Sequence, residues 1–286
     1  MSDAHFSMVS GDMADDAKRR VPLDCNTRRT DMDEKYREQA IIIRQEEIAD
    51  DIYSIWLHTD RIASAAKAGQ FINLYCNDGS RILPRPISIC EIDREDQAIR
   101  LVYRAAGKGT MEFSSLHTGG ILRVIGPLGN GFPQKAKKAL IIGGGIGIPP
   151  MLQLAKELDC EKQIVLGFRE EAFLLEEFEA QGEVYTATER GGFGIRGNVL
   201  DVIRANRLEA EIIYACGPAP MLRALKKYAA EQKIECWISM EERMACGIGA
   251  CLACVCKSTH KDTHSNVNNK RVCAEGPVFR AEEVEF

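Results

Sequence analysis

The chain has 286 residues, 45% of them hydrophobic and 28% charged, and its 42 acidic against 37 basic side chains give a net charge of −5. This balance argues against a general binder of nucleic acids or anionic membranes, which would carry a basic excess. No apolar run approaches the ~20 residues that span a bilayer, and the first residues lack a signal-peptide core. We expect a cytoplasmic protein whose 11 cysteines are mostly reduced.

Residues 1–35 are poor in apolar side chains and have no periodic pattern, so we expect a disordered N-terminal extension there or residues upstream of the natural start. Six short β-rich segments follow, separated by Gly, Pro, Asn and Asp; they are 39–45, 51–59, 71–77, 85–93, 98–107 and 121–129. Close spacing of this kind predicts an antiparallel β-barrel domain over 36–135. Residues 108–116 are the helix candidate in this region.

From residue 138 onward, expected strands alternate with expected helices. The strands are 139–145, 163–168, 183–188, 211–217 and 235–241, and the helices are 148–158, 171–180, 197–206 and 219–232. This alternation predicts an α/β domain with a doubly wound parallel sheet over 136–238. The remaining residues, 239–286, are rich in cysteine and predict a small cofactor-carrying domain.

The cysteine-rich region contains a C-x4-C-x2-C motif, and a fourth cysteine follows after 18 residues; the four are Cys246, Cys251, Cys254 and Cys273. This spacing is typical of plant-type [2Fe–2S] sites, in which a tight loop supplies three thiolates and a distant residue the fourth. Gly247 and Gly249 suit such a loop because they allow positive φ and close approach of backbone N–H groups. A structural zinc site is the alternative, although zinc usually takes paired C-x2-C units. Cys256 is expected to pack in the protein interior and not to ligate the cluster.

Glycines between the first strand and helix of the α/β domain predict a nucleotide site; they are Gly143, Gly144, Gly145 and Gly147. Glycine lets the chain approach a phosphate, and the following helix directs N–H groups at it. The pattern departs from the strict G-x-G-x-x-G motif, so packing alone is the alternative. A second loop, Cys216, Gly217 and Pro218, ends a later strand, where ligands bind open α/β sheets. Cys216 is either a nicotinamide contact or a small buried residue.

In the barrel, Arg85 and Ser88 lie close together in the sequence. The planar donor fork of Arg85 suits a pyrophosphate, and the Ser88 hydroxyl suits a hydrogen bond to the edge of a flavin ring. Tyr103, Arg104, Gly109 and Thr110 follow in the segment LVYRAAGKGT. Considered singly, an arginine and a serine on strands are usually ordinary surface residues.

Together, the motifs R-P-I-S, G-x-G-T, G-G-G-I-G-x-x-P and C-G-P resemble the ferredoxin-reductase superfamily. The C-terminal R-M-A-C-G-I-G-A-C-L-A-C-V-C is similar to the family of electron-transfer subunits of NAD-dependent, class 1B dihydroorotate dehydrogenases. The resemblance covers about 36–286. The N-terminal extension and the polar insertion DTHSNVNN before Cys273 depart from the family.

The resemblance implies three cofactor sites. FAD would be bound by Arg85, Pro86, Ile87, Ser88, Val102, Tyr103, Arg104, Gly109 and Thr110. NAD would be bound by Gly143, Gly144, Gly145, Gly147, Cys216, Gly217 and Pro218. The [2Fe–2S] cluster would be ligated by Cys246, Cys251, Cys254 and Cys273. No residue is assigned a catalytic role; Ser88 would lie near the flavin's reactive nitrogen and Cys216 near the nicotinamide.

The implied partner is a separate FMN-containing catalytic subunit, in a heterotetramer. Electrons would pass from its FMN through [2Fe–2S] and FAD to NAD+ in pyrimidine biosynthesis. The alternatives are a subunit of a ferredoxin:NADP reductase or sulfide dehydrogenase, the reductase component of an oxygenase, and a non-catalytic, zinc-stabilised binding module. No single ribose-binding residue decides between NAD and NADP.

Overall fold

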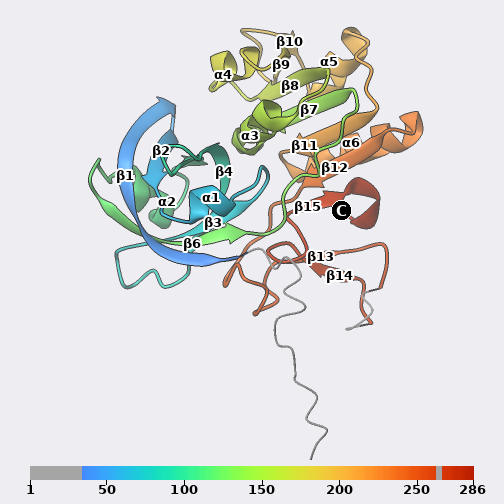
Figure 1. Ribbon diagram of the computed structural model, residues 1–286. Helices are drawn as coiled ribbons and strands as arrows, with labels where there is room; N and C mark the ends of the chain where they lie inside the picture. The colour runs from blue at the N-terminus through green and yellow to red at the C-terminus, as the bar shows by residue number, and fades with distance from the viewer. Residues whose placement is uncertain (1–33, 262–265) are drawn as a thin grey trace, which may run out of the picture. The chain divides into compact units, whose positions relative to one another are not determined.

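The computed structural model describes residues 34–261 and 266–286 (Figure 1). The expected N-terminal extension falls outside them apart from its last two residues, as does part of the polar insertion before Cys273. Within the described ranges, no helix is long and apolar enough to cross a membrane.

The first part of the chain forms a closed barrel of six antiparallel strands, in the order β1-β2-β5-β4-β3-β6, which confirms the predicted barrel. The strands are β1 (Tyr36–Ala49), β2 (Ile52–His58), β3 (Phe71–Tyr75), β4 (Arg85–Asp93), β5 (Ala98–Arg104) and β6 (Ile121–Leu128). Helix α2 (Lys108–Ser114) lies where a helix was predicted, whereas the short α1 (Ile62–Ala65) was not predicted.

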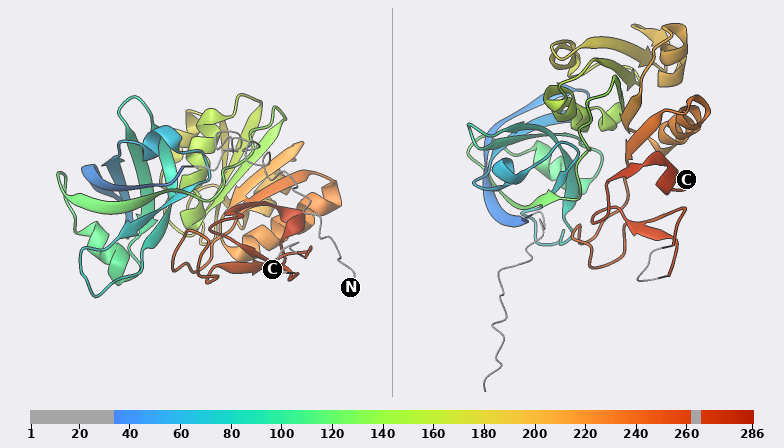
Figure 2. Two further views of the ribbon diagram at one scale, coloured as in Figure 1. Left: turned by 60° about the horizontal axis from the view of Figure 1, so that its bottom comes forward. Right: turned by 45° about the vertical axis from the view of Figure 1, so that its right-hand side comes forward.

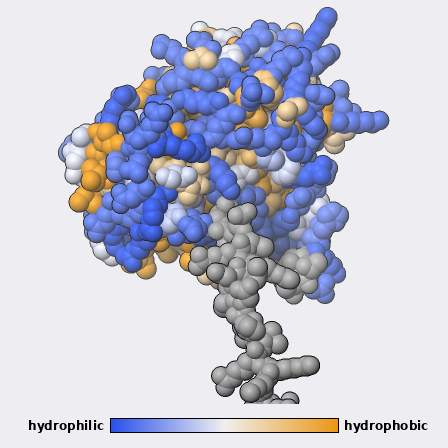
Figure 3. All heavy atoms as spheres, in the orientation of Figure 1, coloured by the Kyte–Doolittle hydropathy of each residue, from blue (hydrophilic) through white to orange (hydrophobic). Residues whose placement is uncertain are grey.

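Alternation of side chains along the strands produces the barrel core. Ile42 of β1 is fully buried, whereas its neighbours Ile41 and Ile43 are 50% and 44% exposed, because successive side chains of a strand face opposite sides. Ile41 pairs with Ile121 of β6, which is also exposed. Figure 3 shows hydrophobic residues gathered over the barrel.

The second part of the chain forms a seven-stranded sheet in the order β10-β9-β8-β7-β11-β12-β15. Its parallel strands are β7 (Ala139–Gly144), β8 (Lys162–Phe168), β9 (Glu183–Thr188), β10 (Ile195–Arg196), β11 (Ile212–Cys216) and β12 (Glu235–Ser239). The helices are α3 (Pro149–Glu157), α4 (Leu175–Glu179), α5 (Val199–Ala205) and α6 (Ala219–Gln232).

Helices cover both faces of this sheet. Ile141 of β7 packs in one core with α3 and α4, while Leu140 and Ile142 pack in another with α5 and α6. The predicted doubly wound sheet is therefore confirmed.

The prediction of a helix over 171–180 was too long. Helix α4 begins at Leu175 because Leu174 has left-handed backbone geometry, with φ of 61°. An α-helix cannot continue through that conformation. The apolar side chains of Phe173 and Leu174 are buried instead, at 6% and 5% exposure.

Glu235, the first residue of β12, anchors the segment that joins the barrel to the sheet. Its carboxylate accepts hydrogen bonds from Lys137 Nζ at 2.8 Å and Trp237 Nε1 at 2.7 Å, and it also pairs with Lys135. Burial opposes ionisation of this carboxyl, but these three donors outweigh it and lower the pKa of Glu235 to about 2.

The cysteine-rich region joins the large sheet rather than standing beside it. Strand β15 (Val278–Arg280) pairs antiparallel with β12, with Ile238 opposite Phe279. A separate two-stranded sheet is formed by β13 (Val255–Lys257) and β14 (Asn269–Arg271). Figure 2 shows the red C-terminal strand beside the orange strands of the large sheet. None of these three short strands was predicted.

Candidate functional site

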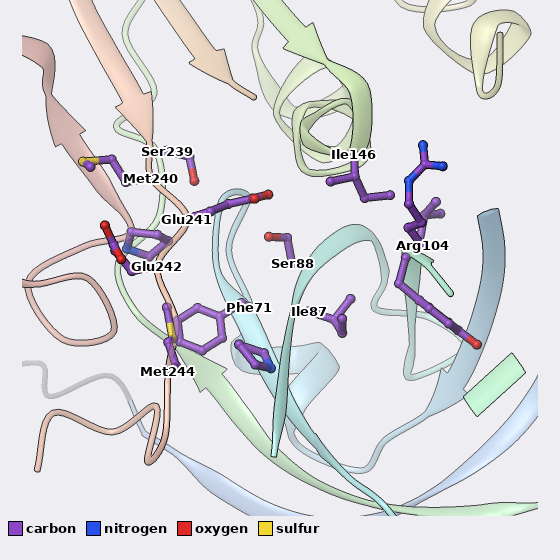
Figure 4. A pocket seen from close by; sticks show the side chains of 14 residues that line it. Phe71, Ile87, Ser88, Arg104, Ile146, Ser239, Met240, Glu241, Glu242 and Met244 are labelled. Atoms are coloured by element: carbon purple, nitrogen blue, oxygen red, sulfur yellow. The ribbon is translucent and has the colours of Figure 1, made fainter. Parts of the chain in front are cut away.

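A cavity of about 270 Å³ lies where the barrel, the glycine loop and the segment after β12 meet (Figure 4). Six of the nine residues predicted to bind FAD line it; they are Pro86, Ile87, Ser88, Val102, Tyr103 and Arg104. They converge because β4 and β5 are antiparallel neighbours, so the beginning of one strand and the end of the other lie at the same end of the barrel.

Arg85 lies just outside this cavity, against the beginning of α2. An added Cβ at Gly109 would be 2.7 Å from Cζ and 2.8 Å from Nη2 of Arg85, so the guanidinium lies directly on this glycine. Arg85 Nη1 donates a hydrogen bond to the Leu83 carbonyl at 2.5 Å. The hydroxyl of Thr110 accepts bonds from two preceding backbone N–H groups, at 3.1 Å each, and so stabilises the turn itself. The fold therefore brings three residues of the two predicted flavin motifs together.

The two predicted nucleotide loops touch each other backbone to backbone. Strands β7 and β11 are parallel neighbours, with Gly143 opposite Cys216, so both loops leave the same edge of the sheet. An added Cβ at Gly147 would lie 2.6 Å from the Cys216 carbonyl and from Gly217 Cα. Gly145 has positive φ, at 54°. Any larger residue at position 147 would prevent the glycine loop from approaching the backbone of Cys216 and Gly217 this closely.

Gly144 of the first loop and Pro218 of the second are also in contact, since an added Cβ at Gly144 would lie 3.2 Å from Pro218 Cδ. The Cys216 thiol is 2% exposed. Burial, and then the nearby Glu241 carboxylate, raise the pKa of this thiol to about 12 against a weaker opposing hydrogen bond with Ser239. A thiol with this pKa stays neutral, so Cys216 is not a thiolate nucleophile.

Sequence reasoning missed several residues of the cavity, and Glu241 is the most informative of them. It follows β12, and Figure 4 shows its side chain extending over the cavity near Ser88. Desolvation by the atoms around it raises the pKa of its carboxyl, although the residue as a whole is exposed to solvent. Its position beyond the carboxyl end of a parallel strand was the available signal. Phe71, Ile146 and Met244 also line the cavity, but nothing in their sequence context distinguishes them from core residues.

The four predicted cluster cysteines lie as two neighbouring pairs, Cys246 with Cys251 and Cys254 with Cys273. Backbone N–H groups point at their sulfur atoms. Ala250 N is 3.3 Å from Cys246 Sγ, Gly249 N is 3.1 Å from Cys273 Sγ, and Cys273 N is 3.4 Å from Cys254 Sγ. The predicted positive φ of the loop glycines is confirmed, at 67° for Gly247 and 87° for Gly249.

These contacts affect the two pairs differently. Burial raises the pKa of Cys246, but hydrogen bonds from Ile248 N and the Cys251 thiol and backbone outweigh it and lower the pKa to about 6. Burial and the adjacent Cys254 raise the pKa of Cys273 to about 12. Among the described residues, no three His, Cys, Asp or Glu side chains are grouped to hold one metal ion. Two thiol pairs with N–H donors fit a [2Fe–2S] cluster, in which each iron takes two protein ligands.

Cys256 lies in β13, 6% exposed, within the same apolar core as Cys254 and Cys273. Its side chain is packed, as expected.

Comparison with known proteins agrees with this geometry. Residues 241–285 match the family model of the iron-sulfur cluster binding domain of dihydroorotate dehydrogenase B. A structure of the NADH-dependent reduced ferredoxin-NADP oxidoreductase, solved for flavin-based electron bifurcation, superposes with a TM-score of 0.78 and 29% identity, covering 87% of this chain and 90% of that one. The ferredoxin reductase of carbazole 1,9a-dioxygenase, at a TM-score of 0.60 and 22% identity, shares the fold, over 70% of this chain and 67% of that one.

Several bacterial relatives carry the name dihydroorotate dehydrogenase B (NAD(+)), electron transfer subunit. The protein of Bacillus velezensis is 43% identical over 249 residues, covering 83% of this chain and 94% of the relative. The protein of Caldanaerobacter subterraneus is 41% identical over 254 residues, covering 88% of this chain and all of the relative. Because identity of this level extends over nearly the whole length of both relatives, the chain belongs to the family of electron transfer subunits of dihydroorotate dehydrogenase B.

Proposed function

We propose that this chain passes electrons from the FMN of a catalytic dihydroorotate dehydrogenase subunit, through its own [2Fe–2S] cluster and FAD, to NAD+ in pyrimidine biosynthesis. One observation carries the proposal. A single cavity is lined by six of the predicted flavin residues, by Ile146 of the glycine loop and by Met244, two residues before the first cluster cysteine. Residues 36–135, 136–238 and 239–286 would hold FAD, NAD and the cluster respectively.

Bound FAD supplies the chemistry that joins one-electron to hydride transfer. The chain's residues position and shield it. Pro86, Ile87 and Val102 offer apolar walls to the flavin ring, and the Ser88 hydroxyl offers a hydrogen bond at its edge. Arg85, fixed by the Leu83 carbonyl and Gly109, would hold the pyrophosphate.

The nicotinamide would enter from the contact between the glycine loop and the Cys216 loop. The carboxyl of Glu241 lines the cavity on this side, and the buried, neutral Cys216 lies at the end of β11 behind it. FAD bound in the cavity would supply the hydride chemistry toward a nicotinamide at this edge. The names of the relatives support NAD+ as the acceptor.

The catalytic subunit would dock over the cluster loop. Two large apolar residues of this loop are exposed, Ile248 at 47% and Leu252 at 61%, and Cys251 between them is also exposed. An exposed apolar rim around a redox centre suits a protein partner. We propose that this partner contains FMN, that the complex is a heterotetramer, and that it works in the cytoplasm.

The test is anaerobic co-purification of the chain with an FMN-containing dihydroorotate dehydrogenase subunit. We expect FAD and two irons per chain, and dihydroorotate-dependent reduction of NAD+ that requires both subunits. Zinc instead of iron, or a chain without flavin, would contradict the proposal.

The likeness to the ferredoxin-NADP oxidoreductase supports a second candidate, electron exchange between reduced ferredoxin and a nicotinamide cofactor. Electron transfer with ferredoxin but not with dihydroorotate would favour it over the first.

A further inference from the structure

Asn73, in the middle of β3, is a buried barrel residue that bonds to the cluster loop. Its side chain is fully buried, and its Nδ2 donates a hydrogen bond to the Cys246 carbonyl at 3.0 Å, between residues 173 apart in the chain. Its Oδ1 has no hydrogen-bond partner among residues 34–261 and 266–286. Because a buried amide is costly without partners, the bond to Cys246 fixes this side chain and the loop to each other.

The shape of the loop gives a second, independent sign of this contact. Gly247 has a φ of 67°, and an added Cβ there would lie 2.8 Å from Oδ1 and 3.0 Å from Cγ of Asn73. The loop is therefore seated directly on the asparagine, with no room for a side chain between them.

The contact also joins the cluster loop to the flavin cavity. On the barrel side, Asn73 lies two residues after Phe71 and pairs with Pro86, and both line the cavity. On the loop side, Met244 lines the cavity two residues before Cys246. The hydrogen bond between Asn73 and Cys246 thus connects the barrel residues that line the cavity directly to the first cluster ligand.

We infer that Asn73 is a positioning residue for electron transfer between the cluster and the flavin. It acts by holding the Cys246 end of the loop at a fixed distance from the cavity. Each transfer moves one electron between the cluster and FAD, and no bond forms or breaks in the chain. The inference rests on the proposed function, since it requires both cofactors in the chain.

The test uses the full chain with both cofactors bound, reduced by NADH in a stopped-flow instrument. Bleaching of the flavin reports the hydride step and bleaching of the cluster reports the electron step. For Asn73→Ala we expect flavin reduction within twofold of wild type and cluster reduction slowed by clearly more than twofold, because the rate of electron transfer falls steeply with the distance between the two centres. The EPR spectrum of the chemically reduced cluster should also change, because the Cys246 end of the loop is released.

Asn130→Ala is the matched control. Asn130 also bonds to the cysteine-rich region, through the Glu275 carbonyl at 3.1 Å and the Val278 carbonyl at 2.8 Å, but it does not bond to a predicted ligand. We expect this variant to retain the wild-type EPR spectrum and the wild-type rate of cluster reduction. The nearly isosteric Asn73→Leu removes the donor without leaving a large cavity, and it should reproduce the effect of Asn73→Ala.

Several outcomes would overturn the inference: cluster reduction within twofold of wild type in Asn73→Ala, equal slowing of both steps, the same change in Asn130→Ala, or loss of the cluster from both Asn73 variants. The last result would mean that Asn73 is needed to assemble the cluster and not to position it. A wild-type chain that binds no FAD or no iron would refute the proposed function instead, so the two failures are distinguishable.

Discussion

Replacing Gly109 by alanine would move the Arg85 guanidinium without removing its charge. The new Cβ would lie 2.7 Å from Cζ and 2.8 Å from Nη2 of Arg85, whereas unstrained contacts begin near 3.5 Å, so the fork must shift by roughly 1 Å. Arginine is flexible, so the chain should still fold. A displaced fork loses charge-assisted hydrogen bonds of about 1.5–3 kcal/mol. We therefore expect FAD to bind roughly 10- to 150-fold more weakly.

Titration of the flavin-free protein with FAD, followed by quenching of flavin fluorescence, measures this change. Gly79→Ala is the control, since no described atom lies within 4 Å of an added Cβ there, and it should bind FAD as wild type does. Arg85→Ala provides a double-mutant cycle. In that background Gly109→Ala should have little further effect, because the side chain that it displaces is absent.

Two results would refute the reasoning. Gly109→Ala could bind FAD as tightly as Gly79→Ala does, which would mean that Arg85 does not contact the cofactor. Alternatively, the effects of Gly109→Ala and Arg85→Ala could add fully, which would mean that the glycine itself contacts the cofactor.

Three further predictions concern the other sites. Gly147→Ala should separate the two nucleotide loops and raise the KM for NADH about tenfold or more with FAD and iron content unchanged; an unchanged KM would argue against this site. Cys246→Ser should abolish the EPR signal of the cluster while Cys256→Ser retains it, and equal loss in both would contradict the assignment of ligands. Glu235→Gln should lower the free energy of unfolding at pH 7 by about 1–3 kcal/mol, since its pKa of about 2 lies below the ~4.3 of an unfolded chain. The stabilisation by this carboxylate is complete above about pH 5 and is lost as the pH falls toward 2, so thermal melts of Glu235→Gln and wild type should converge in acid; a constant difference would refute the assignment.

Much of the fold was predictable because it rests on local periodicity. Ile41, Ile42 and Ile43 alternate across the barrel wall, and β7, β8, β10 and β11 of the large sheet are each followed by a helix. The three residues of β15 carry no such pattern, because a strand this short is specified by the edge of β12 and not by its own sequence. Helix α4 was overpredicted because the left-handed geometry of Leu174 arises from tertiary packing.

The residues of the site also fall into a predictable and an unpredictable group. Spacing along the chain was enough to find the four cysteines and the glycine loop, since their chemistry requires those intervals. Glu241 and Asn73 are single polar residues without a motif. Their interest comes from what the fold places beside them, a cavity in one case and the Cys246 carbonyl in the other.

The pairing of β15 with β12 has a consequence for how electrons travel. Many redox chains carry a cluster on a tethered module that swings between donor and acceptor. Here the stretch that follows the last cysteine is hydrogen-bonded into the sheet that would hold the nucleotide. Transfer in this arrangement does not wait for diffusion of a tethered module, and its rate is governed by distance and driving force. The same pairing means that deleting or replacing the cluster region would remove β15. The edge of β12 would then be free to pair with other chains.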